Sequence, residues 1–349
     1  MIHSLPPFTT TLIGSFPHLD ADALCRSLGA SIDIPAWPQL PRRNFRESMY
    51  VQYSARLPGV QLDEVNQKIT FNTIDDLSPA LEIFYEHVLA DDVNWFALEP
   101  DYAAGFFALL NAAKNFSGEW LKGHVTGPIS FGLTVTDQSL RSSLYNEALA
   151  DVIVKNMALN TRWQIRQLQS VRDHVIIFVD EPYLAAFGSA FISVSREQVI
   201  ALLDEVFEAL HLEGALAGVH CCANTDWSVL LATQVDILNL DAYGYLENLA
   251  LYPIDLRNFL DRGGRIAWGI VPNNEGILNV DADRLADRMR AGLNLISTKA
   301  RSRGVEIRSA ELADRSLITP SCGLGSTSIE IADRVVETLA RTGEILKRG

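Results

Sequence analysis

Short apolar runs alternate with amphipathic helical stretches along most of the chain. Eight runs have the length and composition of β-strands. They cover residues 9–15, 93–99, 120–127, 174–181, 215–220, 235–241, 264–271 and 315–321. Helical periodicity follows several of them, as in residues 196–214, which end on a glycine, and in residues 281–301. Strands that are apolar almost throughout are typical of a parallel sheet covered on both faces.

Eight strand-then-helix units predict a TIM (β/α)8 barrel. Such a barrel uses about 250 residues, whereas this chain has 349. Most of the surplus lies between the first two strands. We therefore expect one domain over residues 1–349, with a long insertion after the first strand, residues 17–90, that caps the barrel mouth. A doubly wound open sheet is the main alternative, but no glycine-rich dinucleotide motif follows the first strand.

Charge and cysteine content narrow the class of protein. A net charge of −14 argues against nucleic acid or an anionic membrane as the main partner. We find no apolar run near the roughly 20 residues that span a bilayer and no signal-peptide pattern. Four cysteines in 349 residues do not form a disulfide framework. We therefore expect a cytoplasmic location, where such cysteines serve a metal or catalysis.

Chemically notable residues recur at the predicted strand ends, which is where TIM-barrel active sites lie. These residues are Ser15, Glu99, Asp180, His220, Asp241 and Cys322. An unpaired carboxylate at the end of an apolar strand is costly, so Asp180 needs a cationic partner. A substrate ammonium group fits this role, and a structural arginine such as Arg162 is the alternative.

The stretch AGVHCCANTDW, residues 217–227, contains a His-x-Cys pair. Alternate residues leaving a strand point the same way, so His220 and Cys222 could share one ion while Cys221 points elsewhere. Imidazole and thiolate are preferred zinc ligands. The pair alone is also compatible with a hydrogen-bonded histidine and a cysteine that packs as a small apolar side chain. Cys322, followed by Gly-Leu-Gly, supplies a third candidate ligand at the same barrel mouth.

One histidine and two cysteines with an open fourth position are typical of catalytic zinc. Two thiolates balance the 2+ charge, so the site suits activation of a thiol substrate by lowering its pKa. Hydrolysis by zinc-bound water is the alternative chemistry. Asp241, a water molecule or the substrate could occupy the fourth position.

These motifs resemble the C-terminal catalytic barrel of cobalamin-independent methionine synthase, within the superfamily that also contains uroporphyrinogen decarboxylase. The matching motifs follow the family's order, and they are LIGSFP (12–17), VTGP (125–128), VDEP (179–182), the His-x-Cys pair and SCGLG (321–325). The resemblance implies a zinc-dependent methyltransferase that moves a methyl group to zinc-bound homocysteine, giving methionine.

The resemblance also implies roles for individual residues. Metal ligands would be His220, Cys222, Cys322 and Asp241, and substrate-binding residues would be Ile13, Gly14, Ser15, Glu99 and Asp180, with Asp180 and Asp241 as catalytic residues. Two of these positions depart from the family. Asp241 stands where the family has a zinc-binding glutamate, and it could bind zinc, support another ligand or leave the position to water. Glu99 only roughly matches the glutamate of the family's second-strand motif.

A third departure concerns the methyl donor. The full-length enzyme has a second, N-terminal barrel that helps to bind methyltetrahydrofolate, and this chain has no room for it. Stand-alone catalytic barrels of the superfamily are similar to methyltransferases that use methylcobalamin or a methylated corrinoid protein. We therefore expect a small thiol as substrate and a corrinoid as donor. The alternatives are a metal-free decarboxylase or lyase of the uroporphyrinogen decarboxylase type and a non-catalytic corrinoid-binding accessory protein.

Overall fold

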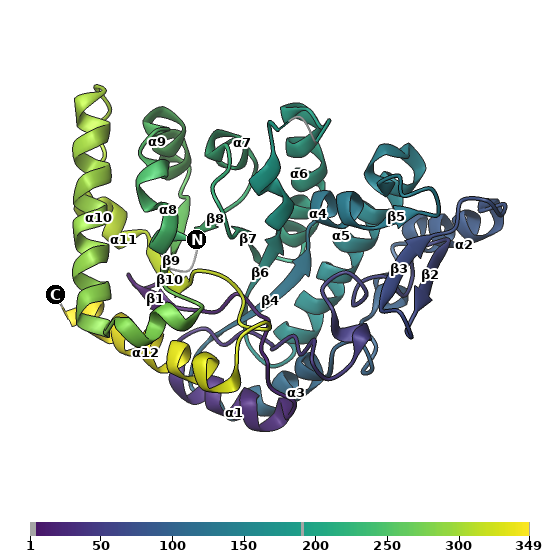
Figure 1. Cartoon of the computed structure of the whole chain (residues 1–349), viewed down its shortest axis with the longest axis horizontal. Coiled ribbons are helices and arrows are strands. Elements are labelled where there is room, and N and C mark those ends of the chain that lie inside the picture. The colour runs from purple at the N-terminus through teal and green to yellow at the C-terminus, as the bar shows by residue number, and fades with distance from the viewer. Residues whose placement is uncertain (1–4, 190–191, 349) are drawn as a thin grey trace.

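A curled parallel sheet of seven strands lies at the centre of the molecule (Figure 1), and the computed structural model describes residues 5–189 and 192–348. The strand order is β1-β10-β9-β8-β7-β6-β4, and all neighbours are parallel. The strands are β1 (Thr9–Thr10), β4 (Trp120–Thr126), β6 (His174–Asp180), β7 (Leu216–Cys221), β8 (Ile237–Leu240), β9 (Arg265–Val271) and β10 (Ser316–Pro320). The carboxyl ends of these strands therefore meet at one edge of the sheet.

Helices cover the outer face of this sheet (Figure 1). The α-helices are α1 (Ala21–Ser31), α2 (Ser78–Leu89), α3 (Ala104–Ala113), α4 (Pro128–Thr134), α5 (Glu147–Gln169), α6 (Arg196–Leu212), α7 (Trp227–Ala232), α8 (Ala242–Leu249), α9 (Pro253–Asp261), α10 (Ala282–Ser302), α11 (Ser309–Asp314) and α12 (Ile329–Arg348). Shorter 3-10 helices are η1 (Phe45–Glu47), η2 (Val93–Phe96), η3 (Ser143–Tyr145), η4 (Pro182–Ala186) and η5 (Glu275–Asn279). The two helices predicted at 196–214 and 281–301 are confirmed as α6 and α10.

Seven of the eight predicted strands are present, and the prediction for residues 93–99 is wrong. Residues Val93–Phe96 form the 3-10 helix η2. The buried Phe96 ring packs edge-on against Phe84, with 5.5 Å between ring centroids. A short apolar run is compatible with both a strand and a helix. Here the aromatic packing against α2 stabilises the helical conformation.

A proline-containing segment, residues 34–39, lies between the two edge strands of the sheet. Its backbone forms isolated parallel bridges from Ile34 and Gln39 to the β1 side and from Ala36 to Lys122 in β4. The Ile34 N–H donates to the Thr10 carbonyl at 3.0 Å, and the Trp37 N–H donates to the Lys122 carbonyl at 3.2 Å. Proline lacks the N–H that a regular ladder requires. The stretch IDIPAWPQL, residues 32–40, therefore lacks the sequence pattern of a strand.

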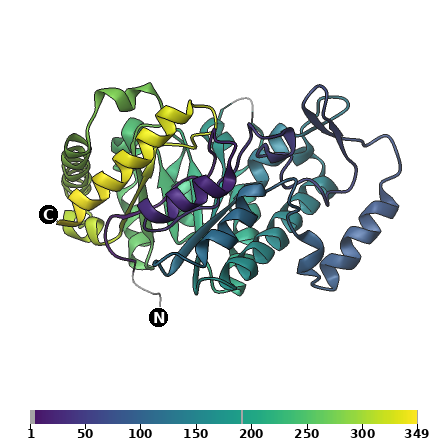
Figure 2. The same ribbon diagram turned by 90° about the horizontal axis from the view of Figure 1, so that it is seen from below.

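The range predicted as an insertion, 17–90, is not one continuous cap. Its beginning supplies α1, which lies beside α12 in Figure 2, and the bridging segment 34–39. Its remainder supplies η1, α2 and the strands β2 (Val60–Asp63) and β3 (Lys68–Phe71). With β5 (Thr136–Asp137) these strands form a separate three-stranded sheet. We therefore describe the fold as α/β with a curled parallel sheet and a small second sheet at one end (Figure 1).

Apolar side chains pack on both faces of the main sheet, as its strand composition predicts. A small cluster fills the inner face, with Ile34, Ile176, Phe178, Ile237, Ala267 and Leu317 among its members. The larger cluster lies between the sheet and the surrounding helices. Among the helices of the described residues, none combines the length and apolarity needed to span a bilayer.

Candidate metal and substrate site

A cavity of about 420 Å³ opens at the carboxyl ends of the strands. Six predicted site residues line it, namely Ile13, Ser15, Asp180, His220, Cys222 and Cys322. The bridging segment and the chain after it also contribute to the wall, with Gln39, Pro41, Ser48, Met49 and Tyr50. The remaining lining residues are His124, Thr126, Pro182, Gly323, Gly325 and Ser326. These six residues thus lie around one cavity, and a short part of the range 17–90 forms a section of its wall.

Three potential metal ligands meet in this cavity. His220 lies near the end of β7, Cys222 follows that strand, and Cys322 follows β10. One ligand atom from each residue lies within 4.8 Å of the others. The neighbouring Cys221 is fully buried elsewhere and its thiol donates to the Ala223 carbonyl at 3.5 Å. The alternation of side chains after a strand thus separates the two adjacent cysteines as predicted.

The imidazole of His220 is oriented by Asn239 in β8. The amide nitrogen of Asn239 donates to the Ala267 carbonyl at 2.7 Å and to the Thr319 hydroxyl at 2.9 Å. Its oxygen is therefore the acceptor in the short hydrogen bond to His220 Nδ1, so Nδ1 carries the proton. The lone pair of Nε2 remains, and this buried atom has no partner among the described residues. An oriented imidazole with a free Nε2 beside two thiols fits Zn²⁺.

The two thiols of the group have different pKa values. The nearby Cys322 thiol and His220 imidazole lower the pKa of Cys222 to about 4. Cys222 is therefore the thiolate of the pair, and its hydrogen bond and negative charge raise the pKa of Cys322. A bound cation would favour the thiolate at both positions.

Asp180 ends β6 at the cavity wall. Burial raises the pKa of Asp180 to about 6, although the nearby His220 and Lys122 act in the opposite direction. Its Oδ1 has no partner among the described residues. Arg162, the structural partner considered from the sequence, instead pairs with Asp91 and Glu213. Asp180 thus retains an oxygen for a cationic ligand.

Lys122 is a buried cation that the sequence did not single out. Its Nζ donates to the Ile13 carbonyl at 2.7 Å and lies 4.2 Å from the centroid of the Phe178 ring. Burial lowers the pKa of Lys122 to about 7. The signal was a lysine inside an otherwise apolar strand. A charge in that position requires a partner in the interior, and Lys122 connects β4 to the Ser15 loop.

The Ser15 loop and the Cys322 loop hold each other. The Leu324 N–H donates to the Ser15 carbonyl at 2.8 Å, and the Gly325 N–H donates to the Ser15 hydroxyl at 3.3 Å. Gly14 has φ +154°, a conformation that disfavours side chains. The loop predicted for substrate binding therefore also positions the third candidate metal ligand.

Three predicted site residues, Gly14, Glu99 and Asp241, do not line the cavity. Glu99 forms an ion pair with Arg56 at 2.9 Å, and its side chain is 45% exposed. Asp241 caps α8, because its Oδ1 accepts from the Gly244 N–H at 2.7 Å. It lies outside the group of three ligand atoms. Glu99 and Asp241 are also the two positions at which the sequence departs from the family motifs.

Glu181, next to Asp180 in the sequence, is a buried carboxylate that is bonded to the start of α4. It accepts from the Ile129 and Ser130 N–H groups at 2.9 and 2.7 Å and from the Ser130 hydroxyl at 2.6 Å. Burial raises the pKa of Glu181 to about 7. The contacts attach the start of α4 to the end of β6, so Glu181 supports the wall of the cavity.

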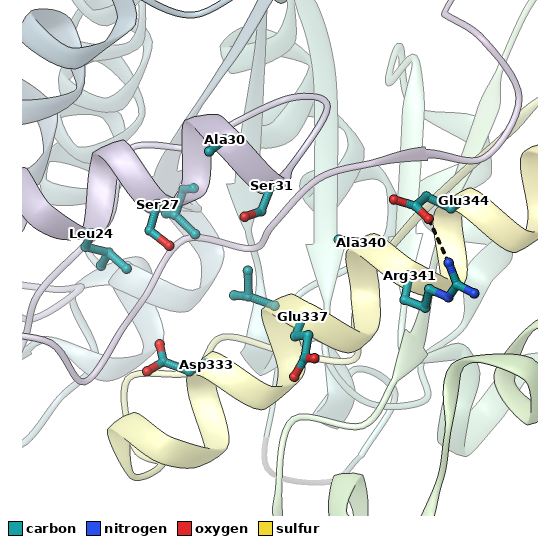
Figure 3. A pocket seen from close by; sticks show the side chains of 11 residues that line it. Leu24, Ser27, Ala30, Ser31, Asp333, Glu337, Ala340, Arg341 and Glu344 are labelled. Carbon is teal, nitrogen blue, oxygen red and sulfur yellow. Dashed lines mark hydrogen bonds and ion pairs between the residues drawn. The ribbon is translucent and has the colours of Figure 1, made fainter.

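A second groove, of about 740 Å³, lies between α1 and α12 (Figure 3). Charged residues of α12 line it, and Arg341 there pairs with Glu344 at 3.1 Å. The groove lies away from the strand ends, and the candidate metal ligands are not among its lining residues. We therefore place the functional site in the smaller cavity.

Comparison with known proteins agrees with the resemblance seen in the motifs. No protein-family model matches the chain. A methionine synthase from Methanocaldococcus jannaschii is 22% identical over 231 residues, which are 65% of this chain and 65% of that protein. The chain thus matches somewhat less than two thirds of that relative's length.

Two solved structures share the fold over almost the whole chain. A B12-independent methionine synthase from Shewanella sp. W3-18-1, solved in complex with selenomethionine, has a TM-score of 0.58 and 16% identity and covers 98% of both chains. A methyltransferase from Methanosarcina mazei has a TM-score of 0.55 and 14% identity, over 98% of this chain and 94% of its own. The resemblance to this superfamily is therefore confirmed through the fold and a weak sequence match.

Proposed function

We propose that the protein is a zinc-dependent methyltransferase that methylates a thiol, with homocysteine as the acceptor and methionine as the product. The observation that carries the proposal is the group formed by His220, Cys222 and Cys322 at the strand ends. Their ligand atoms lie within 4.8 Å of one another, and the His220 nitrogen that faces the thiols is unpaired. The methionine synthase and methyltransferase relatives support the same reaction class.

The protein's own residues would prepare the acceptor for attack. Zn²⁺ held by these three side chains would lower the pKa of a coordinated thiol and keep it nucleophilic at neutral pH. Asp180 would accept a hydrogen bond from the substrate ammonium group through its unpaired Oδ1. The Ser15 loop would bind the carboxylate. Asp241, already committed to the start of α8, would support the site electrostatically and leave the fourth position to the thiol.

A corrinoid methyl donor finds no support, and the expectation of methylcobalamin or a corrinoid protein partner is withdrawn. The Shewanella enzyme that shares the fold is described as B12-independent. The non-catalytic corrinoid carrier loses its basis for the same reason. The proposal therefore defines the acceptor and the metal, and the donor is to be found by screening methylated folates and sulfonium compounds.

Metal content of the purified protein tests the proposal. We expect about one zinc per chain in the wild type and loss of most of it in Cys222→Ser, because two ligands hold zinc poorly. Inductively coupled plasma mass spectrometry measures this directly. Cys322→Ser should behave in the same way and should abolish methyl transfer while circular dichroism shows a folded chain.

Cys221→Ser is the matched control, because this adjacent cysteine lies outside the ligand group. It should retain zinc. A wild type purified without metal that also fails to bind added zinc would refute the proposal. In that case the hypothesis of a metal-free decarboxylase would be tested next, with polycarboxylate substrates.

We further propose that residues 34–39 take the place of an eighth barrel strand. The support is their parallel bridging to both β1 and β4. This arrangement keeps the Ser15 loop, the cavity and the metal ligands on one rim.

A further inference from the structure

Unpaired buried polar atoms concentrate in the cavity. Among the described residues, eight buried side-chain nitrogen or oxygen atoms have no hydrogen-bond partner. Four of them belong to residues that line this cavity, namely His124 Nδ1 and Nε2, Asp180 Oδ1 and His220 Nε2. The proposed function explains the unpaired atoms of Asp180 and His220. It leaves His124 without a role, although an unpaired buried polar group is costly.

The His124 ring is held rigidly. Its side chain lies on Trp37, with 3.8 Å between ring centroids and 24° between ring planes. A Cβ atom on Gly14 would lie 2.5 Å from His124 Nδ1, so the ring also packs closely against the Ser15 loop. Tyr53 and Gln164 donate to the His124 carbonyl at 2.9 and 3.1 Å. The ring is therefore fixed, while neither of its nitrogens has a hydrogen-bond partner among the described residues.

The electrostatic surroundings define the kind of ligand that His124 can bind. Burial, followed by the positive charge of Lys122, lowers the pKa of His124 well below its usual value. The neutral ring offers one N–H donor and one acceptor. In the parallel ladder between β4 and β6, His124 pairs with Phe178. Thr126, two residues further along β4, pairs with Asp180. A carboxylate thus lies on the β6 side, and a cation lies beneath His124.

We propose that His124 is a substrate-binding residue that determines specificity, and that its ring N–H donates to the carboxylate of an amino-acid thiol. This inference rests on the proposed function and extends it to a residue outside the metal group. The ammonium of the same head group would face Asp180, so the two charges of a zwitterion would meet two different polar groups of the cavity wall. His124 thereby contributes to recognition at a site from which Glu99 is absent.

Thiol binding to the cobalt-substituted protein tests the assignment without a methyl donor. Thiolate coordination is followed by its charge-transfer absorption, first with homocysteine and then with 3-aminopropane-1-thiol, which lacks only the carboxylate. We expect His124→Leu to weaken homocysteine binding about tenfold, the effect of one lost hydrogen bond to a charged group. Binding of the aminothiol should change by less than about twofold.

Two further variants complete the design. Glu344→Gln should leave both affinities unchanged, because Glu344 pairs with Arg341 in α12, outside the cavity. His124→Phe, which retains an aromatic ring against Trp37, replaces His124→Leu if that variant does not fold.

The outcomes separate the two hypotheses. A wild type that takes up no cobalt, or that binds neither thiol, contradicts the proposed function. A wild type that binds both thiols, with homocysteine affinity unchanged in the His124 variant, overturns the His124 assignment alone. An equal loss for both thiols also overturns it, because the variant would then have disturbed the whole cavity.

Discussion

His220 can offer only one ring nitrogen to a metal, because Asn239 engages the other. The two donor hydrogens of Asn239 are fixed by the Ala267 carbonyl and the Thr319 hydroxyl, so its oxygen must face the imidazole. Histidine ligands generally depend on such a partner for their tautomer and orientation. Asn239 therefore supports the candidate metal site without being a ligand itself.

Asn239→Leu keeps the side-chain volume and removes the acceptor. We expect zinc affinity to fall about 10- to 100-fold, as measured by competition with a chromophoric chelator. Thr319→Val is the milder control, because Asn239 would still donate to Ala267. An Asn239→Leu protein with wild-type affinity would show that His220 needs no such support.

Sequence reasoning singled out the candidate ligands more readily than the residues that surround them. His220, Cys222 and Cys322 stood out because histidine and cysteine have few roles outside metals, catalysis and the core. Lys122 and Asn239 each carried a weaker signal, a polar side chain inside an apolar strand. Such a side chain indicates only that it has a polar partner in the interior. Which residue is the partner depends on the register between neighbouring strands, and the sequence of one strand does not determine that register.

At the level of elements, the strands that were predicted correctly are those with regular ladders. β6, β7 and β9 are buried on both faces and therefore appear as continuous apolar runs. The exception is informative. Residues 34–39 carry prolines, which remove donors from a ladder, whereas residues 93–99 had the composition of a strand and became η2. In both segments, contacts with other parts of the chain determine the backbone conformation. These contacts are the bridges to β1 and β4 for residues 34–39 and the packing against α2 for η2.

Gly105 in α3 allows this helix to approach the bridging segment. A Cβ atom there would lie 1.8 Å from the Pro38 carbonyl oxygen. Helix propensity alone would favour Gly105→Ala by about 1 kcal/mol. We expect the opposite sign, a loss of roughly 1–3 kcal/mol in the free energy of unfolding, because overpacking dominates. Urea denaturation measures the difference.

Ala112→Gly in the same helix provides the comparison. Its side chain is only partly buried, so the cost should approach the propensity difference of about 1 kcal/mol. If Gly105→Ala were as stable as the wild type, the close approach of α3 to Pro38 would be wrong.

At the scale of the whole molecule, Asp33 links the first strand to the last helix. It accepts hydrogen bonds from the backbone and hydroxyl of Thr10 at 2.7 Å, and it pairs with Lys347 of α12. Burial raises the pKa of Asp33, but hydrogen bonds from Lys347 and Thr10 outweigh this, so the pKa is lowered overall. The charged form therefore stabilises the contact between distant parts of the chain.

Asp33→Asn should lower the free energy of unfolding by about 1 kcal/mol at pH 7, a value reduced by solvent screening. A lowered pKa in the folded state means that this contribution exists above the unfolded pKa and disappears as the pH falls through the folded pKa. The difference between variant and wild type should therefore shrink as the pH falls below about 4, the usual pKa of an aspartate. Urea unfolding at several pH values measures it.

Lys347→Met is the control, since the two contacts from Thr10 would survive and the loss should be smaller than in Asp33→Asn. A difference between Asp33→Asn and wild type that stays constant down to the lowest pH would contradict the electrostatic explanation.

The bridging segment also has a consequence for motion. With prolines at 35 and 38 and only isolated bridges on either side, this seam lacks a continuous ladder such as the one that joins β4 to β6. Local opening costs less where backbone hydrogen bonds are few, so amide hydrogen exchange should be faster along this seam than in β6. His220 and Cys222 belong to β7 and its following loop, on the far side of β6 from the seam. Cys322 follows β10, and its loop is bonded to the Ser15 loop beside the seam. Opening of the seam would therefore loosen the cavity wall next to Cys322 and leave His220 and Cys222 in place.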